Sequence, residues 1–161
     1  MRRNDREETA PEEITAIMGR CEVLRLALNT ETVPYILPVN FGMEPDGMTL
    51  YFHGAMEGTK YDWIARDSRA SFEMDCPQGL VLDEAKRMCT MNYESVIGWG
   101  QLTEITGEAE KMHALRRIMA QYRSEDFEFG TAALPRTRVF RLDVRERTAK
   151  RRIKTPGGKI C

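Results

Sequence analysis

Hydrophobic residues near the start of the chain recur at helical spacing. They are Ile14, Ile17, Met18 and Cys21. This spacing predicts a helix with one apolar face. Thr9 can cap such a helix, Glu12 can complete a capping box, and Pro11 is tolerated in a first turn. We therefore expect a helix from Thr9 to Cys21, preceded by a polar arm.

Beyond Cys21, apolar residues alternate with other residues, which is typical of strands. The strands predicted in this way cover residues 24–28, 33–41, 48–53, 70–75, 92–104 and 136–147. Pro34 and Pro38 fall inside the second of them, so we expect that strand at an edge, at a bulge or beside a ligand. The Glu-Pro-Asp-Gly sequence at 44–47 predicts a hairpin turn. The long strand at 92–104 contains glycines that allow a bend, as in a barrel.

The other segments are few and short. We expect helices at 59–66 and 108–122, an irregular stretch at 76–91 and a connecting loop at 124–135. Six antiparallel strands with few helices predict a mainly β fold, a six-stranded antiparallel barrel. We expect one domain at residues 1–150 and a basic, flexible tail at 151–161, which is either solvated or folded over a ligand.

Composition narrows the functional classes. The chain has 161 residues and a net charge of −1, which gives no broad electrostatic case for nucleic acid. No apolar run reaches membrane-spanning length, and no signal peptide precedes the first helix. The four cysteines lack CxxC spacing, so we expect reduced thiols, no metal site and a cytoplasmic protein. Cys76 and Cys89 flank one loop, but we do not expect a disulfide between them.

The stretch from Leu50 to Trp63 carries the strongest chemical signal. It reads as a strand, a glycine-containing turn and the start of a short helix. Gly58, Thr59 and Lys60 combine an open backbone, a hydroxyl and a cation, which suit a phosphate. His53, at the strand end, would then face the group that carries the phosphate. An ordinary strand–turn–helix with a solvated lysine is the alternative.

Other candidate residues have simpler explanations. Asn40 could offer its amide to a ligand, or it could begin the turn after the second strand. His113 lies beside the apolar stripe of its helix, where a structural or solvated role is expected. No GxGxxG, Walker or GxSxG sequence occurs. A nucleotide site must therefore be built on the surface of the barrel.

Three segments together resemble the FMN-binding split-barrel proteins related to pyridoxamine 5′-phosphate oxidase. They are Pro38–Phe41, the run Leu50–Ala55 with Glu57–Lys60, and Thr90–Val96. Within that superfamily the chain is most similar to the 5-nitroimidazole resistance subgroup. The likeness extends over residues 1–150. It departs from true pyridoxamine phosphate oxidases at the last strand, where Arg141-Leu142-Asp143-Val144 replaces their Arg-Leu-x-Pro ending, so vitamin B6 oxidation is not expected.

The resemblance implies a homodimer with FMN in each cleft between the subunits. It implies that the phosphate binds at Gly58–Lys60, that the second-strand segment runs along the flavin ring, and that the long strand also contributes. The implied cofactor-binding residues are Pro38, Val39, Asn40, Phe41, His53, Gly54, Ala55, Gly58, Thr59, Lys60, Tyr93, Glu94 and Ser95. For Tyr93 and Glu94, dimer packing and a surface charge are the alternatives.

A flavin would carry the redox chemistry while the protein positions the reactants. We expect an oxidoreductase that reduces a small electrophile, such as a nitroaromatic, with His53 as the catalytic proton donor. His53 could instead form only a wall of the site. The competing function is a flavin or haem carrier or sensor without turnover, in which His53 could ligate the iron.

Overall fold

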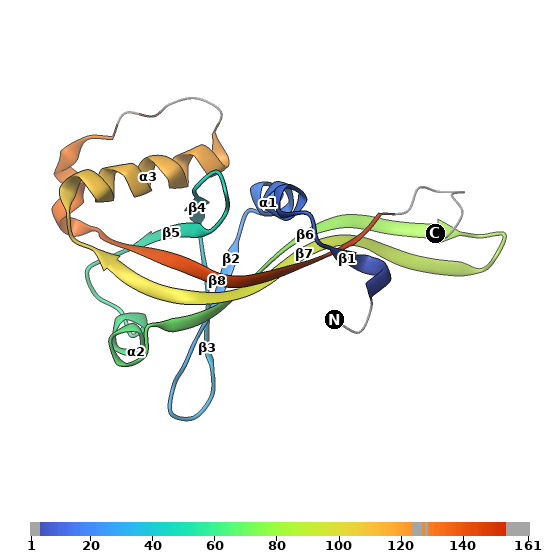
Figure 1. Ribbon diagram of the computed structural model, residues 1–161, viewed down its shortest axis with the longest axis horizontal. Helices are drawn as coiled ribbons and strands as arrows, with labels where there is room; N and C mark the ends of the chain where they lie inside the picture. The colour runs from blue at the N-terminus through green and yellow to red at the C-terminus, as the bar shows by residue number, and fades with distance from the viewer. Residues whose placement is uncertain (1–3, 124–126, 128, 154–161) are drawn as a thin grey trace.

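The computed structural model describes residues 4–123, 127 and 129–153 of the chain (Figure 1). In chain order, the elements are η1 (Asn4–Arg6), β1 (Glu7–Glu8), α1 (Pro11–Arg20), β2 (Leu24–Leu28), β3 (Tyr35–Val39), β4 (Phe41–Met43), β5 (Thr49–Gly54), α2 (Lys60–Arg66), β6 (Arg69–Asp83), β7 (Met88–Ile105), α3 (Glu108–Tyr122), η2 (Thr131–Arg136) and β8 (Arg138–Arg152). Among these residues, no helix is long and apolar enough to span a membrane.

The strands form one antiparallel sheet that closes on itself. Its order is β3-β2-β6-β7-β8-β5-β4, and β1 pairs with the far end of β8. β3 and β4 lie at opposite edges, yet only Asn40 separates them in the chain. The two edges therefore meet through the backbone itself, which curls the sheet into a barrel. The predicted mainly β, antiparallel split barrel is confirmed.

Two apolar layers stabilise this sheet. Alternate residues of each strand point to opposite faces, and the inner face holds fully buried Phe41, Phe52, Phe72 and Phe140. Phe52 and Phe140 stack across β5 and β8 with their ring centroids 5.3 Å apart. On the outer face, α3 packs through Leu115 and its neighbours over β5, β7 and β8.

α3 also lies directly against the edge strand β4. A Cβ atom at Gly42 would collide with the backbone of Arg117 and Ile118 in α3. The guanidinium of Arg117 donates from Nε to the carbonyl oxygen of Met43 at 2.7 Å. The missing side chain at Gly42 therefore lets the helix approach the strand backbone.

Three predictions about local structure are wrong. The predicted second strand is two strands, because the chain bends at Asn40 to change sheet edges. The stretch 76–91 is not irregular: β6 and β7 continue through it as a paired hairpin, since the ladder bridges the bulge at Pro77/Gly79 and continues to Asp83↔Met88. Thr9 does not cap α1: Ala10 is the N-cap residue, and the carboxylate of Glu8 accepts from the N–H groups of Thr9 and Ala10.

The C-terminal predictions also need adjustment. β8 runs to Arg152, so two residues assigned to the tail are in the sheet, paired with Tyr93 and Glu94. Residues 154–161 lie outside the described part of the chain. The expected loop before β8 contains the short 3-10 helix η2.

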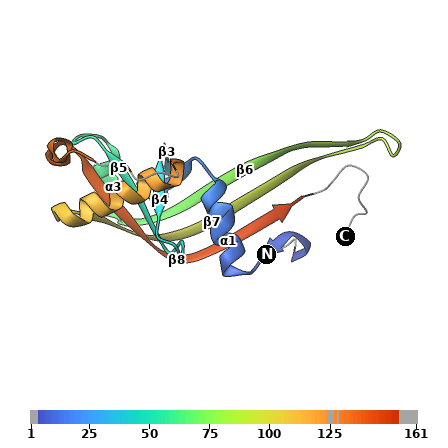
Figure 2. The ribbon, with the colours of Figure 1, turned by 90° about the horizontal axis from the view of Figure 1, so that it is seen from above.

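The paired β6–β7 ribbon extends beyond the other strands. We call residues 79–92 the hairpin arm, since β8 ends opposite Tyr93 and contributes no pairs beyond it. Figures 1 and 2 show the arm reaching away from the barrel, at the end opposite α3. Leu80, Leu82, Met88 and Met91 on the arm are each more than half exposed.

The contact at Gly42 gives a stability prediction. We expect Gly42→Ala to lower the free energy of unfolding by about 2 kcal/mol, because neither backbone can yield without moving α3. Urea denaturation monitored by circular dichroism measures this. Gly130→Ala is the matched control, since a Cβ there meets nothing within 4 Å and φ is −70°. Equal stability of the two variants would contradict the close contact between Gly42 and the backbone of α3.

Candidate functional site

The turn between β5 and α2 is folded into a compact corner. The Tyr61 hydroxyl donates a hydrogen bond to the carbonyl oxygen of Ala55, and the Tyr61 N–H donates to that of Gly58 at 3.1 Å. Thr59 occupies the N-cap position of α2, and its hydroxyl makes no capping bond. α2 has only seven residues, so its dipole adds little to this corner. The side chains therefore decide what the corner can bind.

Lys60 places a cation at this corner. Its ammonium lies 4.4 Å from the centroid of the Tyr61 ring and makes no ion pair with any described carboxylate. A Cβ atom on either Gly54 or Gly58 would lie 3.3 Å from the ammonium nitrogen. Gly58 has a φ of +151°, which other residues rarely adopt. The corner thus presents bare backbone next to a cation that has no anionic partner among the described residues.

A second cation lies at the same corner, and the sequence analysis missed it. Arg138 begins β8 directly opposite Gly54 of β5, and its guanidinium carbon lies 3.9 Å from the Tyr61 centroid. Glu104 accepts hydrogen bonds from Arg138 Nε at 2.8 Å and Nη2 at 2.5 Å. These bonds lower the pKa of Glu104, so the carboxylate stays charged at neutral pH. Only strand pairing reveals this residue, because 84 positions separate it from Gly54 in the chain.

The second-strand segment lies beside the end of β5, as the predicted site requires. Phe41 pairs with Phe52, so Asn40 lies next to His53 at the bend of the chain. The Asn40 and Pro38 side chains are exposed and that of Val39 is half-buried. The Phe41 ring is fully buried in the barrel, and its N–H donates to the Tyr122 hydroxyl at 3.0 Å. Any ligand contact by this segment must therefore come from residues 38–40.

His53 and Lys60 do not share a face of the sheet. Alternation along β5 places His53 on the α3 side with Tyr51, whereas Gly54 faces the side on which the Lys60 ammonium lies. The His53 ring is exposed, and partial desolvation lowers its pKa below the usual histidine value. A neutral imidazole is therefore favoured at neutral pH. Ala55 is exposed at the start of the turn.

The third predicted group lies far from this corner within one chain. Glu94 pairs with Arg151 in β8, whereas Glu104 pairs with Phe140 next to the corner. Ten residues of extended β7 separate these two glutamates, which corresponds to roughly 33 Å. Tyr93 and Ser95, both half-buried, lie at the same distant end. One chain therefore brings together only two of the three predicted segments.

Glu94 is neither exposed nor available to a ligand. It is only 2% exposed, and Arg20 of α1 donates to its two oxygens at 3.0 and 2.8 Å. Gln78 Nε2 donates to it at 3.1 Å, and Arg151 Nε forms an ion pair at 3.0 Å. The alternative of a surface charge is thus wrong for Glu94. This carboxylate fastens α1 to three strands of the sheet.

Two further groups lie away from the corner. The exposed His113 has Nε2 2.5 Å from Glu44, which also accepts from the Tyr51 hydroxyl at 2.8 Å. Cys76 lies with its sulfur 2.9 Å from that of buried Cys21, and both are free thiols. Burial raises the pKa of Cys21. Among the described residues, no group of three or more possible ligands could hold a metal ion.

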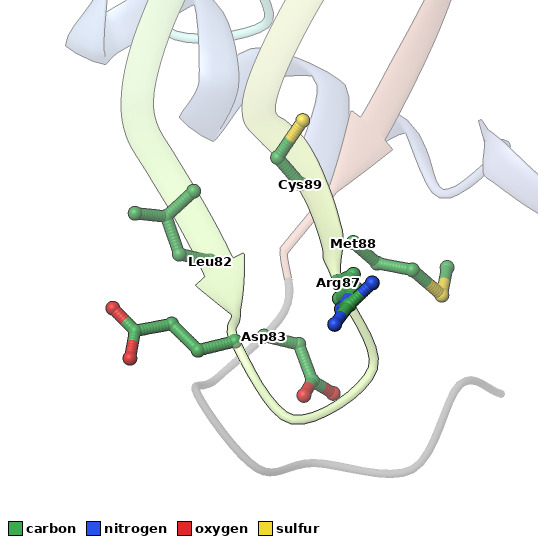
Figure 3. A pocket seen from close by; sticks show the side chains of 6 residues that line it. Leu82, Asp83, Arg87, Met88 and Cys89 are labelled. Atoms are coloured by element: carbon green, nitrogen blue, oxygen red, sulfur yellow. The ribbon is translucent and has the colours of Figure 1, made fainter.

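Two of the cavities on the described surface contain no predicted binding residue in their linings. The first, about 340 Å³, lies at the tip of the hairpin arm (Figure 3). Its lining is Leu82, Asp83, Glu84, Arg87, Met88 and Cys89. The second, about 400 Å³, lies between the start of α3 and η2.

Comparisons with known proteins agree on one family. A family model described as pyridoxamine 5′-phosphate oxidase matches residues 10–151. Among solved structures, the chain is similar to a candidate 5-nitroimidazole antibiotic resistance protein from Bacteroides thetaiotaomicron. That match has a TM-score of 0.80 and 27% identity and covers 89% of this chain and 85% of the other. A comparison with curated proteins gave no match.

Two other solved structures share the fold at lower identity. The flavocytochrome Anf3 from Azotobacter vinelandii matches with a TM-score of 0.79 and 21% identity, over 97% of this chain and 73% of the other. An FAD and heme binding protein from Mycobacterium smegmatis matches with a TM-score of 0.78 and 18% identity, over 94% and 75%.

The environment of Glu94 predicts a structural rather than a binding role. We expect Glu94→Gln to lower the free energy of unfolding by about 2 kcal/mol, because it leaves two arginines facing a neutral amide. Glu73→Gln, which alters an exposed pair with Arg25, is the control and should change it by less than about 0.5 kcal/mol. Chemical denaturation of the purified protein gives both values. An unchanged stability for Glu94→Gln would show that the contacts of Glu94 with Arg20 and Arg151 do not stabilise the fold.

Proposed function

Because the chain belongs to the pyridoxamine 5′-phosphate oxidase family, whose members are flavin-binding split barrels, we propose that it is an FMN-dependent oxidoreductase. Its substrate class is a small electrophile such as a nitroaromatic. The active form is a cytoplasmic homodimer with one FMN in each cleft between subunits. The similarity to the resistance protein at 27% identity supports the substrate class.

The observation that carries this proposal is the Lys60 ammonium, which has no ion-pair partner among the described residues and lies beside bare backbone. A phosphate monoester carries up to two negative charges and several strong acceptor oxygens. The ammonium, the Thr59 hydroxyl and the backbone around Gly58 fit such a group in charge and in available donors. The exposed segment 38–40 next to β5 would then support the flavin ring.

A second copy of the chain would complete the site. Tyr93 and Ser95 lie roughly 33 Å along β7 from the corner, so they can reach a flavin there only from another subunit. The apolar hairpin arm supports the same arrangement, because a two-stranded ribbon with exposed Leu80 and Leu82 is marginally stable in water. Ile97 and Trp99, on the exposed face of β7, extend this apolar surface.

The chemistry divides between the cofactor and the chain. A bound flavin supplies two-electron transfer, after reduction by an external donor. Conversion of a nitro group into a nitroso group and water takes two electrons and two protons. We assign His53 to the delivery of one proton, since it adjoins the segment that would hold the ring. Lys60 holds the phosphate, and the partner's strands exclude water.

The absorption spectrum of the purified protein tests this proposal. We expect flavin bands, a dimer in gel filtration, anaerobic bleaching with NADH or NADPH, and recovery of the bands when a nitroimidazole is added. A Soret band would favour a haem protein, and a flavin that no nitroimidazole reoxidises would favour a carrier. A colourless monomer that takes up no FMN would refute the proposal.

Removal of the Lys60 charge should weaken FMN binding. We expect Lys60→Ala to raise the FMN dissociation constant by about 10- to 100-fold, since it removes one charge-assisted contact with the phosphate. Quenching of flavin fluorescence during titration measures this constant. Lys86→Ala, at an exposed ion pair on the hairpin arm, is the control. Full FMN occupancy in Lys60→Ala would show that the phosphate does not bind at this corner.

Replacement of His53 should affect turnover rather than cofactor content. We expect His53→Ala to retain FMN and to lower kcat roughly 100-fold. Because partial desolvation lowers the pKa of His53, the wild-type kcat should fall as pH rises through a value below about 6.5, and the variant should lose this dependence. Steady-state nitro reduction from pH 5 to 8 measures both.

His113→Ala, which changes the other histidine of the chain, serves as the control for this experiment. The native His113 ring contacts Glu44 and not the segment that would support the flavin, so the His113→Ala variant should keep the wild-type dependence of kcat on pH. An unchanged kcat and pH profile in His53→Ala would limit His53 to a wall of the site.

A further inference from the structure

We propose that Arg138 is a second phosphate-binding residue and that, together with Lys60, it makes the site select the phosphorylated flavin. This inference rests on the proposed FMN function and deepens it. Two neighbouring cations would recognise a phosphate monoester by its double charge. Riboflavin, which has the same ring system and no phosphate, would gain nothing from them.

Strand pairing places the two cations on one face. Arg138 of β8 lies directly opposite Gly54 of β5, and directly paired residues project to the same side of a sheet. The position of a Cβ at Gly54 lies 3.3 Å from the Lys60 ammonium nitrogen. The Arg138 side chain therefore leaves its strand toward the face that carries the ammonium.

Both cations contact one aromatic ring. The Lys60 ammonium lies 4.4 Å, and the Arg138 guanidinium carbon 3.9 Å, from the centroid of Tyr61. The ring is itself held in place, because its hydroxyl donates to Ala55 and its plane stacks on Phe140 at 5.5 Å. Tyr61 thus fixes the spacing of the two charges before any ligand arrives.

The guanidinium keeps donors free for a ligand. Glu104 takes the Nε and Nη2 hydrogens in a bidentate pair, and no described residue accepts from Nη1. A guanidinium presents five N–H donors in a rigid plane, so the Glu104 pair orients Nη1 without consuming it. Arg66 of α2 lacks this placement, since it pairs with exposed Glu31.

Gly54 lets the Tyr61 and Lys60 side chains pack closely against β5. A side chain on Gly54 would meet the Tyr61 hydroxyl at 2.6 Å and the terminal carbon of Lys60 at 3.2 Å. The glycine therefore allows the Tyr61 hydroxyl and the Lys60 ammonium to lie beside the strand, on the face toward which Arg138 projects. With one carboxylate and two cations, the corner has a net positive charge that a dianionic phosphate would compensate.

The test compares FMN with riboflavin in full-length protein. Their dissociation constants, measured by quenching of flavin fluorescence, give a ratio that isolates the contribution of the phosphate. We expect Arg138→Gln, which retains most of the stem over Tyr61, to weaken FMN binding about 10- to 100-fold while riboflavin binding changes less than about 2-fold. Arg138→Lys, which keeps the charge and loses the planar fork, should lie between wild type and Arg138→Gln.

Arg25→Gln is the matched control, because Arg25 is also a strand arginine paired with carboxylates but lies on β2. It should leave the ratio unchanged. A wild-type ratio in Arg138→Gln, with thermal unfolding that shows a folded protein, would overturn this inference and leave the FMN assignment intact. If wild type binds neither flavin, the proposed function itself fails. If Arg138→Gln does not fold, Arg138→Lys provides the test. A wild-type ratio of the FMN and riboflavin dissociation constants in that variant would overturn the inference.

Discussion

The structure depends on the closure of its sheet through a single residue. β3 and β4 are the two edge strands, and Asn40 alone connects them. A sheet whose edges are joined in this way cannot stay open, so the long strands β6, β7 and β8 must curl around the phenylalanine core. The same bend brings residues 38–40 beside the end of β5. Fold and candidate site therefore share one constraint.

The Lys60 corner shows how packing prepares a binding surface. Tyr61 belongs to the barrel core through its stack on Phe140, yet its ring also supports the cationic groups of Lys60 and Arg138. The charges are thus oriented by residues whose own positions are set by the core. Such preorganisation reduces the entropy lost when a charged ligand binds.

The long strands β7 and β8 carry different groups at the two ends of the molecule. At one end, β7 and β8 carry Glu104 and Arg138 to the corner. At the other, Glu94 is buried among Arg20, Gln78 and Arg151 and fastens α1 to the sheet. The exposed apolar hairpin arm extends beyond these contacts of Glu94. The contacts of Glu94 hold the sheet next to the base of the arm. They would fix the direction in which the arm meets a second subunit.

The mainly β barrel class, the three α-helices and the strand–turn–helix around Lys60 could be predicted from the sequence, because they depend on local periodicity and turn residues. The same patterns placed residues 58–60 among the candidates, the resemblance to the family added segment 38–41, and strand pairing brings both to β5. Local patterns failed at 76–91, where Pro77 and Gly79 suggested a loop but cross-strand pairing sustains a ribbon. They also could not reveal that Glu94 is buried or that Arg138 faces Gly54. Those facts depend on which distant residues become neighbours, and only the tertiary structure decides that.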